Sequence, residues 1–232
     1  KEKETLLELN KISMFYNNRR ILNDISFKVN RSEVLGLLGP NGVGKSTIFK
    51  IIMNIENQKS GKIFLNGVDC TKLPIHERSK KFHLSYCPQY GGYFYDLSVL
   101  ENLTAVAEIH VKEKNLRISK IDKIIGQFGF DSILNVKAKH ISGGERRKLA
   151  IGMAIINDPE ILLLDEPYAA LDILSIKMIQ EIIINLQSME KMSIIVCDHN
   201  ARDLLTCVDR AIVLSNGKII ASGSPQEIIN DT

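Results

Sequence analysis

The chain has 232 residues, with 30 basic and 27 acidic side chains and a formal net charge of +3. This balance excludes the concentrated basic surface of a nucleic-acid binder, so we expect no nucleic-acid partner. Hydrophobic residues make up 44% and charged residues 25%, which is typical of a soluble globular protein with its own core. Because no signal peptide or apolar run of membrane-spanning length is found, we expect membrane association only through partners.

The first part of the chain is predicted to be mostly strands. Residues 25–29 alternate with period two, and residues 34–38 are continuously apolar and end in glycine. An Asn-Gly pair after residue 65 is typical of a tight turn. We predict strands over residues 6–14, 25–29, 34–38 and 62–65, with a helix over 48–53.

The apolar spacing changes to a helical period between about residues 97 and 139. Further on, we predict helices from Glu145 and over 173–186, and strands over 161–164, 194–197 and 211–214. All-apolar strands separated by a helix indicate a parallel sheet covered on both faces. We therefore expect one α/β domain over residues 1–232. Its core spans about 1–90 and 140–232, and a helical lobe of about 91–139 is inserted into it.

A glycine-rich segment follows the predicted strand 34–38 and precedes a predicted helix. It fits the pattern G-x-x-x-x-G-K-[ST], whose backbone N–H groups surround phosphate oxygens. Lys45 is expected to contact the β/γ phosphates of ATP, and the Ser46 hydroxyl to bind Mg²⁺. The predicted ATP-binding residues are Gly39, Pro40, Asn41, Gly42, Val43, Gly44, Lys45, Ser46 and Thr47.

Two carboxylates follow the buried strand 161–164. Asp165 is expected at the carboxyl edge of the sheet, where open α/β folds bind ligands, and its oxygens suit Mg²⁺ directly or through water. Glu166, the next residue, points in a different direction and can reach an attacking water as general base.

A second anion site is predicted where Ser142 and Glu145 form a capping box that opens a helix. Gly143 and Gly144 fall in its first turn, where glycine stabilises a helix poorly but leaves backbone N–H groups accessible. Three cations follow at residues 146–148, against the helix-dipole preference; they either serve a function or simply face solvent. One ATP has one γ-phosphate, so this second site serves either an ATP held by another molecule or a different anion.

The phosphate loop, the segment 141–145 and the segment 164–167, in this order, resemble the nucleotide-binding domain of ABC transporters. The resemblance covers nearly the whole chain. It implies a P-loop NTPase fold of ABC type, with a mixed sheet core, an N-terminal antiparallel β part and an inserted helical lobe. It also implies a homodimer in which the phosphate loop of one copy and the Ser142–Glu145 segment of the other enclose ATP and Mg²⁺.

Further roles are implied by the same resemblance. Tyr16 matches the aromatic residue that stacks on adenine, Gln89 the glutamine that senses Mg²⁺ and the attacking water, and His199 the histidine that contacts the γ-phosphate. Asp172 matches the aspartate of the dimer loop, although the serine common before it is absent here. Ile141 stands where the family usually has leucine, a change that conserves volume.

Several segments are closer to one subfamily, the ATPases of lipopolysaccharide export in Gram-negative bacteria. They include residues 73–78, 97–103 and 142–147. This similarity implies binding to two transmembrane permease subunits at the cytoplasmic face of the inner membrane. The ATPases of branched-chain amino-acid importers share much of the pattern and are the alternative. An inactive or non-transport relative is disfavoured because Lys45, Asp165, Glu166 and His199 are all present.

Aromatic residues cluster around Gln89. Five of the 14 aromatic residues fall within ten positions, and aromatic side chains are enriched in interface cores. We therefore expect the region Tyr90–Leu103 to help bind the permease subunits, with internal packing of the lobe as the alternative. The five residues are Tyr86, Tyr90, Tyr93, Phe94 and Tyr95.

Overall fold

The computed structural model describes residues 4–230, which form two sheets flanked by helices. A four-stranded antiparallel sheet has the order β2-β1-β4-β5, and a six-stranded mixed sheet has the order β10-β9-β3-β8-β7-β6. In the mixed sheet β9, β3, β8, β7 and β6 are parallel, and β10 pairs with β9 antiparallel. The expected α/β fold with an N-terminal antiparallel part is confirmed.

The strands are β1 (Thr5–Tyr16), β2 (Arg19–Asn30), β3 (Val34–Leu38), β4 (Ser60–Leu65), β5 (Val68–Asp69), β6 (Leu84–Cys87), β7 (Ile161–Asp165), β8 (Ser193–Asp198), β9 (Arg210–Ser215) and β10 (Lys218–Gly223). The helices are α1 (Lys45–Met53), α2 (Ile75–Phe82), α3 (Val99–His110), α4 (Lys114–Phe128), the 3₁₀ turn η1 (Ala138–His140), α5 (Gly143–Ile155), α6 (Ile173–Glu190), α7 (Ala201–Leu205) and α8 (Pro225–Asn230). Every predicted strand and helix is present. The helix predicted from Glu145 begins two residues earlier, because Ser142 caps it.

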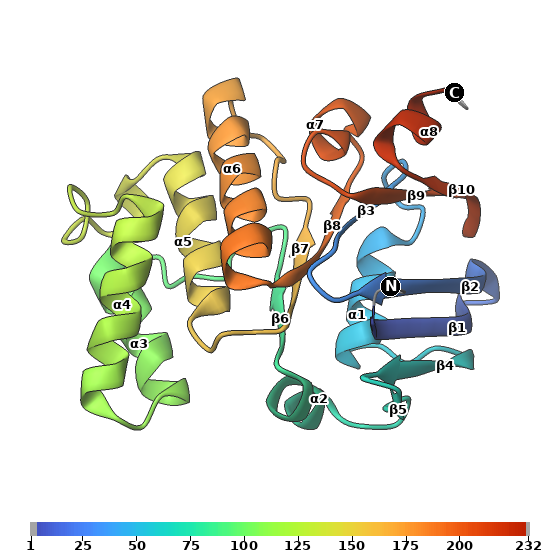
Figure 1. The fold of residues 1–232 in the computed structure, drawn as a ribbon, viewed down its shortest axis with the longest axis horizontal. Coiled ribbons are helices and arrows are strands. Elements are labelled where there is room, and N and C mark those ends of the chain that lie inside the picture. The colour runs from blue at the N-terminus through green and yellow to red at the C-terminus, as the bar shows by residue number, and fades with distance from the viewer. Residues whose placement is uncertain (1–3, 231–232) are drawn as a thin grey trace.

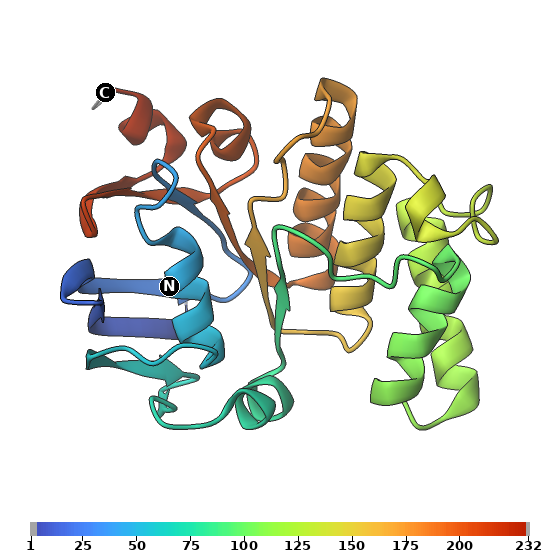
Figure 2. The ribbon, with the colours of Figure 1, turned by 180° about the vertical axis from the view of Figure 1, so that it is seen from behind.

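The mixed sheet is buried on both faces. In β7, Ile161 and Leu163 pack toward α1 and the antiparallel sheet, while Leu162 and Leu164 pack toward α5, α6 and the helical lobe. This division explains why the central strands are continuously apolar, since neither face meets solvent. Figure 2 shows α1 between the two sheets.

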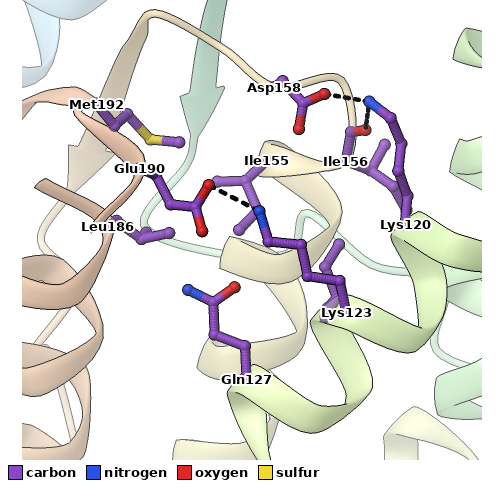
Figure 3. A pocket seen from close by; sticks show the side chains of 10 residues that line it. Lys120, Lys123, Gln127, Ile155, Ile156, Asp158, Leu186, Glu190 and Met192 are labelled. Carbon is purple, nitrogen blue, oxygen red and sulfur yellow. Dashed lines mark hydrogen bonds and ion pairs between the residues drawn. The ribbon is translucent and has the colours of Figure 1, made fainter.

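Helices α3 and α4 lie at one end of the molecule, separated from the mixed sheet by α5 and α6 (Figure 1). Two lysines of α4 reach toward the core across a small pocket (Figure 3). Lys123 Nζ lies 2.7 Å from Glu190 Oε2 at the end of α6, and Lys120 pairs with Asp158. These contacts attach the lobe to the core by polar groups at its margin. None of the helices within residues 4–230 is long and apolar enough to cross a membrane.

Candidate ATP-binding and hydrolysis site

The glycine-rich loop joins β3 to α1 and needs glycine at two positions for different reasons. Gly44 has φ +110°, and a Cβ there would lie 2.6 Å from the side chain of Leu22. Gly42 has φ +76°, and a Cβ there would meet nothing within 4 Å. Gly44 therefore permits close packing against Leu22. Gly42 instead turns the backbone beside open space, as a loop that wraps phosphate requires.

Lys45 is the first residue of α1 and is buried, whereas a lysine at a helix start is usually exposed to solvent. Its ammonium donates to the carbonyl oxygens of Gly39 at 2.6 Å and Pro40 at 3.0 Å. The loop thus holds a positive charge at its own centre, beside the N-terminus of α1. Both features favour an anion at this point.

Asp165 ends β7 and is 3% exposed, so its carboxylate depends on protein donors. The hydroxyl of Ser46 and the thiol of Cys197 both donate to Oδ1, each at 2.9 Å. Oδ2 accepts from the hydroxyl of Tyr86 at 2.9 Å. The Ser46 and Asp165 oxygens lie side by side next to the phosphate loop, which fits the oxygen ligands that Mg²⁺ prefers.

Tyr86 belongs to the aromatic cluster around Gln89 but lies outside the expected partner region Tyr90–Leu103, and its hydroxyl points into the site. Burial, and then the negative charge of Asp165, raise the pKa of the Tyr86 phenol well above its ordinary value. The phenol therefore stays protonated and donates.

Glu166 is the meeting point of the predicted catalytic residues. Its Oε2 accepts from Gln89 Nε2 at 2.8 Å and lies 3.6 Å from His199 Nδ1, while Oε1 lies 3.8 Å from Lys45 Nζ. The backbone of Glu166 has φ +43°, and its N–H donates to the carbonyl of Cys197 at 2.9 Å. Such strained non-glycine residues cluster at functional sites, and here the turn aims the carboxylate at the glutamine and the histidine.

His199 follows β8 and is held by its own neighbour. The carboxylate of Asp198 is buried, and its Oδ1 accepts from the backbone N–H groups of His199 at 2.8 Å and Asn200 at 3.0 Å. The imidazole is 45% exposed and faces Glu166. The backbone is thus fixed while the ring can still reach a ligand.

The predicted capping box is present at the start of α5. Ser142 Oγ accepts from the N–H of Glu145 at 3.2 Å, and Glu145 Oε2 accepts from the N–H of Ser142 at 2.7 Å. Gly143 is exposed, as an anion site requires. Gly144 is buried, and a Cβ there would lie 2.4 Å from Ser175 Oγ. For Gly144 the structure therefore gives a packing reason that differs from the one expected.

Ser175 was not predicted, although it stands three residues after Asp172. Its Oγ donates to Asp172 Oδ2 at 2.6 Å, and the other carboxylate oxygen caps the first turn of α6. Asp172 is thereby bound to the helix end that Gly144 contacts. The hydroxyl donor and backbone N–H of Ser175 lower the pKa of the Asp172 carboxyl.

The three cations at residues 146–148 do not form a purely solvated face. Each donates to a carbonyl oxygen: Arg146 to Ile141 at 2.9 Å, Arg147 to Pro88 at 2.8 Å and to Gln89, and Lys148 to Phe128 at 2.9 Å. Burial lowers the pKa of Lys148. Arg147 thus ties α5, the helix that begins in the Ser142–Glu145 segment, to the segment that carries Gln89.

The predicted residues fall into two groups that approach each other at Gln89 and Gly143, which line one groove of about 200 Å³. One contains the phosphate loop with Asp165, Glu166, Gln89 and His199. The other contains residues 142–145 together with Asp172, and within residues 4–230 no hydrogen bond or ion pair joins Ser142 or Asp172 to the first group. Tyr16 lies at the end of β1, 41% exposed, with its ring accessible for stacking.

The fold and these two groups define a P-loop ATPase of ABC type. The ABC transporter family matches residues 22–169, and the chain belongs to this family as an ATP-binding and ATP-hydrolysing subunit. The chain is 38% identical to the "Lipopolysaccharide export system ATP-binding protein LptB" of Haemophilus influenzae, over 98% of this chain and 94% of that protein. It is 36% identical to the protein of that name from Escherichia coli, over 93% and 89%.

Solved structures agree in fold. The cbiO1 protein of Clostridium perfringens, part of the ABC transporter complex cbiONQ, superposes with a TM-score of 0.89 at 22% identity, over 99% of this chain and 92% of that one. An ATP-binding cassette solved as a dimer bound to ADP and Pi gives 0.84 at 21% identity, over 95% and 99%. At these identities the similarity concerns the fold alone.

Proposed function

We propose that this chain hydrolyses ATP to power the extraction and export of lipopolysaccharide from the inner membrane of a Gram-negative bacterium. The convergence of Gln89, His199 and Lys45 on Glu166 supports hydrolysis. The similarity to LptB proteins, which extends over most of this chain and of each relative, supports lipopolysaccharide as the cargo. Such a subunit acts at the cytoplasmic face of the membrane, held there by its partners.

The phosphate loop binds the triphosphate through its backbone N–H groups and the ammonium of Lys45, which exchanges its carbonyl contacts for phosphate oxygens. Ser46 and Asp165 would hold Mg²⁺, directly or through water, and the ion would supply positive charge that neutralises the phosphates. Tyr16 stacks on adenine, which contributes roughly 0.5–1.5 kcal/mol beyond burial.

Glu166 accepts the proton of the attacking water, and Gln89 and His199 orient that water and the γ-phosphate. The carboxylate of Glu166 already accepts a hydrogen bond from the Gln89 amide, so the proposed base and Gln89 are in contact. General-base catalysis contributes about 10²–10⁴ to the rate. The decisive experiment is Glu166→Gln, which keeps the size of the side chain and removes the base.

The Glu166→Gln variant is expected to bind ATP with unchanged affinity, to lose turnover by at least 100-fold, and to elute as a dimer with ATP on a sizing column. Glu160→Gln is the matched control and should retain activity, because Glu160 is a half-buried glutamate directly before the same strand whose carboxylate pairs with Arg31. Undiminished hydrolysis in Glu166→Gln would refute the proposed base.

We infer a homodimer because, within residues 4–230 of one chain, no hydrogen bond or ion pair joins Ser142 or Asp172 to the phosphate loop. In a twofold arrangement the Ser142–Glu145 segment and Asp172 of one copy complete the ATP site of the other. The exposed Gly143 N–H and the positive end of α5 then face the γ-phosphate. This arrangement gives the second anion site its ligand.

The surface for the two transmembrane permease subunits is proposed around Tyr90, Phe94 and Tyr95, within Tyr90–Leu103. These side chains are exposed, and Tyr95 stacks on Tyr93 with centroids 5.7 Å apart. The buried Asn102 fixes Phe94 by accepting from its N–H at 2.6 Å and donating to its carbonyl at 3.0 Å. A rigid loop that presents aromatic side chains suits binding of a partner element.

Phe94→Asp is expected to abolish co-purification with the permease subunits while ATP binding is retained. The control is Ile109→Asp, at an apolar and more exposed position on α3 of the same lobe. Intact co-purification of Phe94→Asp would refute this surface. The identity of the captured membrane proteins tests the cargo, because permeases of an amino-acid importer would contradict lipopolysaccharide export and support the alternative.

A further inference from the structure

Tyr86 reaches from the surface of the molecule to the proposed metal site. Its ring helps line a groove of about 300 Å³ between the helices of the core and those of the lobe, beside Ile75 and Met153. It also packs edge-on against Phe49 of α1, with centroids 6.3 Å apart and planes at 77°. At the other end of the same side chain, the hydroxyl lies 2.9 Å from Asp165 Oδ2.

The donors to Asp165 are unevenly divided. Oδ1 accepts from Ser46 and Cys197, whereas Tyr86 is the donor to Oδ2 among the described side chains. Ser46 can bind a metal ion through an oxygen lone pair while its O–H still donates to Oδ1. The bond from Tyr86 holds the opposite oxygen, Oδ2, and so fixes the rotation of the carboxylate that keeps Oδ1 facing Ser46.

We propose that Tyr86 is a positioning residue that orients Asp165 for the Mg²⁺ of Mg-ATP. This inference rests on the proposed function, in which Asp165 serves the ion. Groups that hydrogen-bond a metal-ligating side chain fix its orientation, and their loss costs about 10–100-fold in metal affinity. Tyr86 is not a catalytic residue, since it contacts neither the phosphate loop nor Glu166 through any hydrogen bond described.

Tyr86→Phe removes the hydroxyl and keeps the ring in contact with Phe49. The Mg²⁺ concentration for half-maximal ATPase activity is expected to rise about 10-fold or more. In Tyr86→Phe, the Mg²⁺-dependent gain in affinity for a fluorescent ATP analogue should need correspondingly higher Mg²⁺ concentrations than in the unaltered protein. In EDTA, where no Mg²⁺ is free, the two proteins should bind the analogue with equal affinity. A merely structural role would change nucleotide affinity in EDTA as well.

The matched control is Tyr168→Phe. That hydroxyl is buried and lies 2.9 Å from Cys207 Sγ, away from Asp165. Its loss should leave the Mg²⁺ dependence unchanged. An unchanged Mg²⁺ dependence in Tyr86→Phe, or an equal shift in both variants, overturns the inference. If the unaltered protein does not hydrolyse ATP in the presence of Mg²⁺, the proposed function itself fails, which is a distinguishable outcome.

A second measurement does not depend on the stability of Tyr86→Phe. 3-Fluorotyrosine placed at position 86 keeps the ring and the hydroxyl. Its ¹⁹F resonance is expected to move when Mg²⁺ is added to the complex with ATP, because the hydroxyl reports on the carboxylate that receives the ion. A resonance that moves with ATP alone and not with Mg²⁺ overturns the inference.

Discussion

Replacing Gly144 by alanine tests the contact between α5 and α6. The new Cβ would lie 2.4 Å from Ser175 Oγ and 2.8 Å from its Cβ, well inside van der Waals contact. Overpacking of this type costs about 1–3 kcal/mol, and alanine regains roughly 0.5–1 kcal/mol of helix stability. We expect a net loss of about 1–2 kcal/mol.

The assay is thermal or urea unfolding, in which this loss corresponds to about 2–8 °C in the midpoint for a chain of this size. Gly143→Ala is the control, because its Cβ would lie 3.6 Å from the nearest atom, Leu171 Cδ2. We expect Gly143→Ala to keep stability, so any loss of ATPase activity there reports on the anion site.

The double variant Gly144→Ala/Ser175→Gly removes both atoms that the new methyl group would meet. It should be less destabilised than the sum of the two single variants, which would show the coupling expected of residues in contact. Full stability of Gly144→Ala alone would refute the packing explanation and return Gly144 to the anion site.

Two further predictions concern polar contacts of the site. Arg147→Lys cannot donate to two successive carbonyls as the guanidinium does, so the segment carrying Gln89 loosens; we expect kcat to fall several-fold at unchanged ATP affinity, and an unchanged kcat would refute the role of this contact. The pKa of Asp172 is lowered by Ser175, so the cap contributes fully above the ordinary value of 3.8 and fades as the pH falls through the lower folded value. Unfolding curves between pH 6 and 3 should therefore show a smaller loss of stability in Asp172→Asn than in the unaltered protein, and parallel curves would contradict this.

The central strands could be predicted because their burial on both faces leaves a continuous apolar pattern. The region 75–87 could not. Its helix α2 carries Arg78, which is fully buried and donates to the carbonyls of Ile51 and Ile52 at the end of α1. A buried arginine that satisfies a helix end looks like a surface charge in the sequence, so hydrophobic periodicity misses the helix.

The candidate site shows the same difference between residues that the sequence predicts and residues that it does not. Residues that touch the ligand in this family carry recognisable spacing, and Lys45, Gln89, Glu166 and His199 do converge. Residues that hold them in place do not. Tyr86 belongs to a four-residue strand, too short for period two to show which way its side chain points. The sequence marks it only as one of the aromatic residues clustered around Gln89. Ser175 matters through its distance to Gly144, which only the packing of two helices creates.

The separation of the two groups within one chain has a genetic consequence. In the proposed dimer, a chain with Lys45→Ala has a defective phosphate loop but an intact Ser142, and a chain with Ser142→Arg has the reverse. Each variant alone builds only defective composite sites. In mixed dimers, one of the two sites draws both of its halves from unaltered segments, so equal co-expression should restore about a quarter of all sites. Two alleles that each fail alone should therefore complement one another, whereas both changes on one allele should fail to complement either.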